Sequence, residues 1–222
     1  TLGGGVGWMV RRHGLAIDDL VGAEVVTADG EVREVSAEQH PDLFWALRGG
    51  GEGLGVVTRF DFVAHEVTDV VFGRLVLTLE DAADLLAGWR DVQVGADERL
   101  TTTLSLMPAM GDRPAMAMLG VCFAGPEAEA APLLDRLRGL STVLEDDVRA
   151  RPYAEILEDE ELPHAGMGIS MRNTLLPDLS DEVLADVAAL TAAPPTMVSL
   201  RALGGAFSRV PEEATAFPSR SA

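Results

Sequence analysis

The sequence predicts an α+β protein, and three observations support this fold class. Stretches rich in β-branched residues recur between stretches whose apolar residues return at helical spacing. From residue 70 onward the expected order is strand, helix, strand, strand, helix, strand. This order favours an antiparallel sheet covered by helices on one face. Hydrophobic residues also make up 47% of the 222 positions, which is enough for a globular core.

Each element can be justified from the local pattern of residues. Strands are expected where apolar and β-branched residues alternate or run together; they lie at 20–28, 31–35, 56–63, 70–79, 100–108, 114–123, 142–149, 169–176 and 197–203. Helices are expected where the period is near 3.6 residues; they lie at 8–13, 40–47, 80–94, 126–140, 153–158 and 179–190. The last twelve residues, 211–222, are expected to form a loop.

Capping and turn residues set several of these boundaries. Gly14 ends the first helical turn, and Asp29-Gly30 predicts a two-residue hairpin. Ser36 with Gln39 predicts a capping box for the next helix, in which Pro41 suits the first turn. Within that helix, the apolar residues are expected in the core; these are Phe44, Trp45 and Leu47.

Charge and cysteine content exclude several function classes. The formal net charge is -19, with 36 acidic and 17 basic residues, all of the latter arginine. Nucleic acid is therefore not an expected partner, because neutralising phosphates needs basic patches. No run of about eighteen uncharged apolar residues occurs, so no membrane partner is expected, and we expect a cytoplasmic protein. The single Cys122 excludes an internal disulfide framework and a cysteine-based zinc site.

Two glycine clusters organise the first part of the chain. One contains Gly3, Gly4, Gly5 and Gly7, and the other spans residues 49–55. Glycine reaches positive φ freely and lets a ligand approach bare backbone, and successive free N–H groups can bind anions. Two interpretations stay open on composition alone: loops that cradle a large anionic or polar ligand, or tight turns.

The usual nucleotide signatures are missing from both clusters. A Walker loop needs a lysine, which the chain lacks. The dinucleotide fingerprint fails because Val10 and Val56 stand where its third glycine belongs. A nicotinamide-dependent Rossmann enzyme is therefore poorly supported.

Five motifs in order give a more specific indication. They are TLGGGVGW at 1–8, RRHGLAIDDL at 11–20, AEVVTADG at 23–30, HPDLFWALRGGG at 40–51 and GVVT at 55–58. This series resembles the second half of the PCMH-type FAD-binding domain of vanillyl-alcohol-oxidase-type flavoenzymes, nearest to the berberine-bridge-enzyme-like oxidoreductases. With a change of character near residues 66–69, the resemblance implies two domains: the C-terminal part of an FAD-binding domain at 1–67 and an incomplete substrate domain at 68–222.

The resemblance also implies a cofactor and a reaction. FAD would be contacted mainly through backbone by residues of both glycine clusters and the turn between them; these are Thr1, Gly3, Gly4, Gly5, Gly7, Asp18, Gly55, Val56 and Val57. The reaction would be a two-electron oxidation of a small organic substrate such as a sugar, alcohol or secondary metabolite. Asp19 departs from the family's usual asparagine and so loses an amide donor.

The family's N-terminal subdomain and closing segment are not found in the sequence, so we expect a partial chain. Region 1–67 should then present an apolar face that needs the missing segment, a second chain or dimerisation to cover it. The alternative function is a catalytically inactive fragment or a binding module that keeps the fold.

No catalytic residue is assigned from the sequence. Tyr153, His164, Arg172 and Asn173 are candidates for a pocket, and the alternative for each is a surface or packing role. His13 is interpreted as a helix-end histidine rather than a base. The acidic run 158–161 is interpreted as a solvated surface, because oxygen-ligand loops space their carboxylates apart. No metal site is therefore expected.

Overall fold

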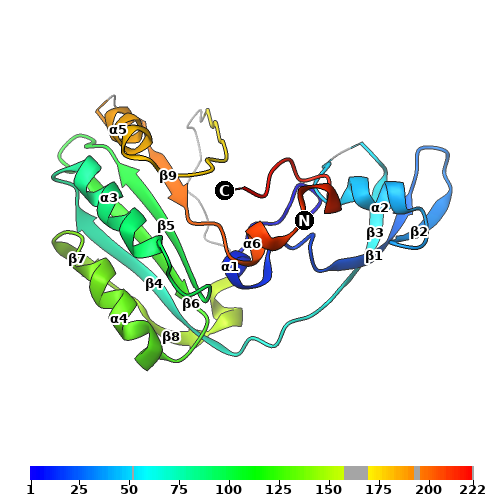
Figure 1. Cartoon of the computed structure of the whole chain (residues 1–222), viewed down its shortest axis with the longest axis horizontal. Coiled ribbons are helices and arrows are strands. Elements are labelled where there is room, and N and C mark those ends of the chain that lie inside the picture. The colour runs from blue at the N-terminus through cyan, green and yellow to red at the C-terminus, as the bar shows by residue number, and fades with distance from the viewer. Residues whose placement is uncertain (52, 158–169, 193–195, 222) are drawn as a thin grey trace. The chain divides into compact units, whose positions relative to one another are not determined.

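A computed structural model describes residues 1–51, 53–157, 170–192 and 196–221. The chain divides into two compact units (Figure 1). Unit 1 comprises Thr1–Glu66, Asp97–Thr101 and Ala202–Ala222, and unit 2 comprises Val67–Ala96 and Thr102–Arg201. The C-terminal residues thus cluster with the N-terminal region, whereas the sequence predicted one second domain at 68–222.

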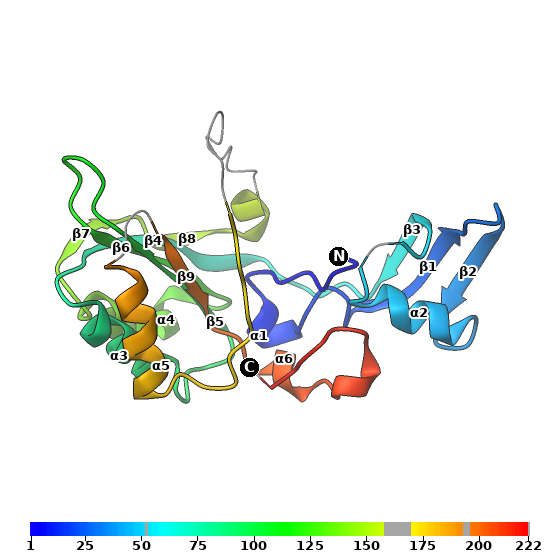
Figure 2. The same cartoon turned by 90° about the horizontal axis from the view of Figure 1, so that it is seen from above.

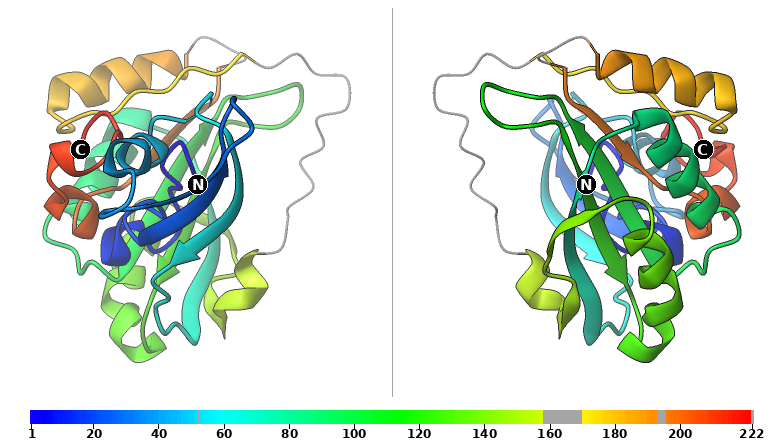
Figure 3. Two further views of the ribbon diagram at one scale, coloured as in Figure 1. Left: turned by 90° about the vertical axis from the view of Figure 1, so that its right-hand side faces the viewer. Right: turned by 90° about the vertical axis from the view of Figure 1, so that its left-hand side faces the viewer.

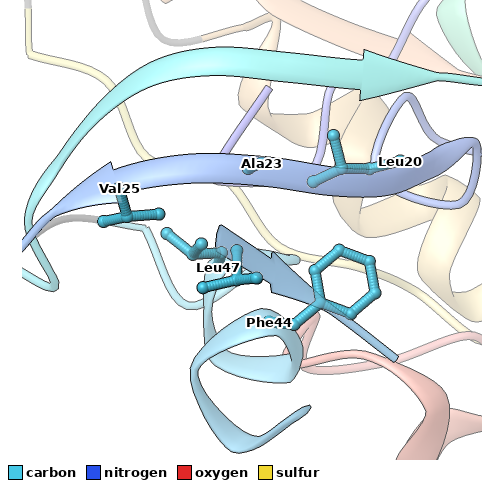
Figure 4. Close-up of a cluster of buried hydrophobic side chains, with 6 residues drawn as sticks. Leu20, Ala23, Val25, Phe44 and Leu47 are labelled. Carbon is cyan, nitrogen blue, oxygen red and sulfur yellow. The ribbon is translucent and has the colours of Figure 1, made fainter. Parts of the chain in front are cut away.

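Unit 1 contains a three-stranded antiparallel sheet in the order β2-β1-β3. Its strands are β1 Leu20–Val26, β2 Val32–Ser36 and β3 Val56–Phe62. The helix α2, Pro41–Leu47, packs on this sheet, and its Phe44 and Leu47 side chains face β1 (Figure 4). Each buried side chain of this size contributes about 1.5–3 kcal/mol relative to exposure, so the cluster fixes α2 and the loop that follows it.

A second small core holds the C-terminal segment, Ala202–Ala222, in unit 1. Val10, Leu15, Ile17 and Phe207 are fully buried together. They join α1, Val10–His13, to α6, Ala206–Arg209, and these helices lie side by side in both views (Figures 1 and 2). The short 3₁₀ helix η2, Glu212–Ala214, lies beyond α6. Residues from opposite ends of the chain thus form one core.

Unit 2 consists of an antiparallel sheet covered by helices, as the sequence predicted. Its antiparallel sheet has the order β7-β4-β6-β5-β9, and β8 also pairs with β4. The strands are β4 Asp69–Thr78, β5 Leu100–Met107, β6 Met116–Phe123, β7 Val143–Asp146, β8 Arg149–Pro152 and β9 Val198–Arg201. The helices α3 Ala82–Gln93, α4 Glu127–Arg138 and α5 Asp181–Leu190 lie on one side of this sheet (Figure 3). The 3₁₀ helix η1, Tyr153–Leu157, follows β8. The α+β prediction is confirmed.

Several local predictions are wrong in detail, and each error has a physical reason. The β1–β2 connection has three residues between Thr27 and Glu31 instead of two, because the Asp29 carboxylate accepts hydrogen bonds from both of those residues. Ser36 does not cap α2. Its hydroxyl accepts the N–H groups of Glu38 and Gln39, both at 3.2 Å, in the turn before α2. The helix itself begins five residues after Ser36, at Pro41.

Trp45 is also not a core residue, because its side chain is 43% exposed and its indole N–H donates to the Glu213 carbonyl at 2.8 Å. The single strand predicted at 142–149 is two strands, β7 and β8, because the Asp146 carboxylate accepts the Val148 N–H and turns the chain between them. The strand predicted at 169–176 is absent over its described residues, 170–176. Residues 170–174 there are all exposed, with Met171 at 82%, so this stretch has no apolar face packed on a core.

Candidate functional site

The two glycine clusters, far apart in sequence, meet at Leu2. The Leu2 carbonyl accepts hydrogen bonds from the Gly49 N–H at 2.9 Å and from the Gly51 N–H at 3.2 Å. Within the first cluster, the Gly4 N–H donates to the Thr1 carbonyl at 2.8 Å. The two loops therefore form one backbone-lined structure, as the ligand-cradling interpretation requires.

A hollow of about 510 Å³ lies at this junction and is lined by Thr1, Leu2, Gly3, Gly51 and Phe60. At Gly3 and Gly51 no atom lies within 4 Å of the place where a Cβ would stand. In the described part of the chain, the Gly3 N–H also has no hydrogen-bond acceptor. Gly3 and Gly51 thus present bare backbone to open space, which suits the close approach of a large flat ligand.

Other glycines of the same clusters serve packing instead. A Cβ on Gly4 would lie 2.9 Å from the Phe217 ring, and one on Gly5 would lie 2.6 Å from the Ala16 Cβ. A Cβ on Gly55 would lie 2.5 Å from the Val26 carbonyl oxygen. All three glycines have positive φ, between 83° and 145°. These residues therefore set the path of the loops.

The remaining residues predicted to contact FAD occupy other places in unit 1. Gly7 has open space around it but does not line the hollow. Val56 begins β3 and is 68% exposed, and Val57 packs against the core cluster beneath α2. Their contact with a cofactor stays a prediction.

Asp18 is engaged by the C-terminal segment. Its Oδ1 accepts from Arg220 Nη2 at 2.7 Å, and its Oδ2 accepts from Arg220 Nη1 at 2.9 Å and from the Leu15 N–H at 2.8 Å. The Arg220 side chain is 2% exposed and the Asp18 side chain 8% exposed. This is a bidentate, charge-assisted pair held away from solvent.

His13 stands at the end of α1, as expected, and has an aromatic partner. Its ring stacks on His65 with the centroids 3.8 Å apart, and His65 Nε2 lies 2.8 Å from Asp19 Oδ1. Burial, together with His65 and Arg12, lowers the pKa of His13. The neutral imidazole is therefore favoured in the folded state.

The other candidates form no common site among the described residues. Tyr153 is half-buried at the start of η1, and burial raises its pKa. Arg172 and Asn173 are exposed. His164 and the acidic run 158–161 lie outside the described residues, and among those that are described no group of three or more His, Cys, Asp or Glu side chains is placed to hold a metal.

The residues predicted from the sequence to contact FAD did not include Leu2, Gly51 or Phe60. Gly51 lay in the second glycine motif, so its signal was visible in the sequence. Leu2 acts through its carbonyl oxygen and Phe60 through the edge position of its strand, and neither feature has a residue-type signature. Exposed apolar residues lie along β3 and directly after it, at Val56, Phe60, Phe62 and Val63. What covers them stays a prediction.

No helix in the described ranges combines the length and apolar character that crossing a membrane requires.

Comparisons with known proteins point to flavoproteins. No protein-family model matches the chain. An uncharacterised FAD-linked oxidoreductase of Bacillus subtilis is 32% identical over 233 residues, covering 100% of this chain and 51% of that protein. This chain therefore spans about half the length of that relative.

Solved structures agree with this result. The structure of 6-hydroxy-D-nicotine oxidase from Arthrobacter nicotinovorans is 30% identical with a TM-score of 0.63, covering 70% of this chain and 35% of that one. Berberine bridge enzyme from Eschscholzia californica is 24% identical with a TM-score of 0.77, covering 99% of this chain and 47% of that one. The latter supports the fold.

Proposed function

We propose that this chain, whose homologues are FAD-linked oxidoreductases of the berberine-bridge-enzyme-like type, binds FAD at its paired glycine loops and serves the oxidation of a small organic substrate. The observation that carries the proposal is the junction at Leu2, where one carbonyl oxygen holds both loops together. This junction leaves Gly3 and Gly51 with their backbones facing the same hollow.

The residues of the hollow fit part of a flavin cofactor. FAD carries a flat ring system and a polar, anionic chain, and a backbone without side chains allows close approach of either part. Thr1 adds a hydroxyl group and Phe60 an apolar wall. Bound FAD would supply acceptance of two electrons from the substrate, while the protein supplies binding and orientation.

The substrate of this chain is proposed only as a class. A small alcohol, sugar or secondary metabolite is consistent with the reaction type that FAD supports. The alternative is a binding module or an inactive fragment that keeps the fold without turnover.

The proposal can be tested with a glycine that tolerates a side chain. Gly3 does not need positive φ, and nothing lies within 4 Å of its missing Cβ, so Gly3→Leu should fold normally while filling the hollow. The matched control is Gly139→Leu in unit 2, where φ is -77° and only ordinary contacts arise. FAD binding would be followed by flavin fluorescence and by absorbance retained on the protein.

We expect Gly3→Leu to weaken FAD binding at least about tenfold, which corresponds to about 1.4 kcal/mol, and Gly139→Leu to bind as the unaltered chain does. Equal binding by both variants would show that the hollow is not the cofactor site. A folded, unaltered chain that takes up no added FAD would favour the binding-module alternative. Flavin that appears in the filtrate after denaturation would identify non-covalent binding.

A further inference from the structure

We infer that Arg220 is a positioning residue for the flavin site, acting through Asp18 and Phe217 to fix the backbones of both glycine loops. This inference rests on the proposed function, because it assigns a role within the same site. It also gives Asp18 a different task from the direct cofactor contact that the sequence suggested. Three sets of contacts in unit 1 support this role of Arg220.

The first set is the ion pair itself. The Arg220 guanidinium donates to both carboxylate oxygens of Asp18 and also to Thr215 Oγ1 at 2.9 Å. Asp18 in turn accepts the Leu15 N–H, which follows the turn at Gly14. The acceptor oxygens of Asp18 are therefore occupied by its own chain, and its negative charge is neutralised by a planar fork of matching geometry.

The second set is aromatic. The Arg220 guanidinium carbon lies 5.4 Å from the Phe207 ring centroid and 5.3 Å from that of Phe217, within the range of a cation–π contact. The two rings meet edge to face with centroids 5.9 Å apart. Phe207 belongs to the buried core around α1, so the guanidinium of Arg220 lies against one ring of that core and against the Phe217 ring packed on it.

The third set connects Phe217 to both glycine loops. Its ring occupies the space beside Gly4, where a Cβ would lie 2.9 Å away, and its backbone occupies the space beside Gly49, where a Cβ would lie 2.7 Å from its Cα. The neighbouring Ala216 N–H donates to the Arg48 carbonyl at 2.9 Å. One residue of the C-terminal segment thus contacts the first loop and the second.

The contacts together explain why an arginine stands at this position. Loops of glycine lose much conformational freedom on ordering, so a binding-competent shape needs external support. Arg220 provides it through Phe217, which packs against both Gly4 and Gly49. Gly3 and Gly51 stay bare on the side of the hollow. A preordered loop binds its ligand more tightly because less ordering is required during binding.

The test compares Arg220→Gln with Arg220→Lys and with Leu184→Ala. The first removes the charge, the second keeps the charge without the fork, and the third truncates a buried residue of α5 in unit 2. Two quantities are measured below the unfolding transition: the dissociation constant for FAD and the hydrogen-exchange rates of the Gly4 and Gly49 amides. These amides bond to the Thr1 and Leu2 carbonyls.

We expect Arg220→Gln to raise both amide exchange rates about tenfold or more and to weaken FAD binding by a similar factor, with partial rescue in Arg220→Lys. Leu184→Ala should lower the unfolding midpoint while leaving both loop amides and FAD binding unchanged. Loop exchange in Arg220→Gln at the rate of the unaltered chain would overturn the inference. So would a rise in Leu184→Ala equal to that in Arg220→Gln, because the effect would then be general destabilisation.

The outcomes separate this inference from the proposed function. If the unaltered chain binds no FAD, the proposed function fails, and the exchange rates still decide whether Arg220 orders the loops. If FAD binds normally in the unaltered chain and in Arg220→Gln, the function stands and the positioning role is overturned.

Discussion

Replacing Gly49 with alanine should separate the C-terminal segment from the second glycine loop. Gly49 has a φ of 117°, and an added Cβ would lie 2.7 Å from the Phe217 Cα and 2.9 Å from the Ala216 carbonyl carbon. These are backbone atoms, which cannot rotate away as the end of a flexible side chain can. Either the loop or the C-terminal segment must move.

The size of the effect can be worked from the same contacts. An L-residue held at such a φ costs about 1–3 kcal/mol. Movement would also disturb the Gly49–Leu2 and Ala216–Arg48 backbone hydrogen bonds, each worth about 1 kcal/mol. The total is about 3–5 kcal/mol. For a chain of this length, each kcal/mol lowers the melting temperature by about 2–4 °C.

Gly51→Ala is the matched control. Its φ of 79° is also positive, but no atom lies within 4 Å of the added Cβ, so only the conformational cost applies. Gly49→Ala should therefore unfold about 4–8 °C below Gly51→Ala, which corresponds to about 2 kcal/mol from the two hydrogen bonds. Thermal unfolding followed by tryptophan fluorescence is a suitable assay, because Trp45 donates to the Glu213 carbonyl of the C-terminal segment. Equal destabilisation by the two variants would refute the reasoning.

Three further predictions concern other parts of the chain. Trp89→Phe removes a buried 3.0 Å hydrogen bond to the Thr102 hydroxyl, so urea unfolding should show that the free energy of unfolding falls by about 1–3 kcal/mol. Adding Thr102→Val should recover part of this loss, and no recovery would contradict the role of the bond. Because burial lowers the pKa of His13 in the folded state, the unfolded chain binds the proton more readily, and stability should fall as the pH drops through the unfolded value of about 6.5. His13→Gln should flatten the dependence of the melting temperature on pH between about pH 7.5 and about pH 5.5. His40→Asn, which changes an exposed histidine, should keep the slope of the unaltered chain. Equal slopes in the two variants would contradict the assignment to His13. Burial raises the pKa of the Cys122 thiol to about 12, so a thiol reagent should label it only after denaturation; rapid labelling of the folded chain would disprove its burial.

Local signals predicted the elements whose ends are set by nearby residues. Ser180 caps α5 by accepting the Val183 N–H at 3.4 Å, as its position suggested. The strands β5 and β6 pair across the turn that contains Gly111-Asp112. In both cases the deciding contacts lie within a few residues or within one hairpin, so alternation and turn chemistry were sufficient.

The errors lie where distant residues decide the outcome. Trp45 looked like a core residue of an amphipathic helix, but its indole N–H is satisfied by Glu213, 168 positions away. The sequence predicted only a loop at 211–222, yet Arg220 in this segment pairs with Asp18, 202 positions away. Nothing in the local pattern of either segment indicates that it meets the other.

The glycine clusters show the same limit within the candidate site. In sequence, Gly3 and Gly4 are equivalent members of one motif, but the structure separates them by what a Cβ would meet. Gly4 is glycine because the Phe217 ring fills the adjacent space, whereas Gly3 has open space at the hollow. A side chain at Gly4 should therefore reduce stability and cofactor binding together, and one at Gly3 should reduce binding alone. Close packing at Gly4 and open space at Gly3 are thus two different surroundings within one motif, and only the three-dimensional contacts distinguish them.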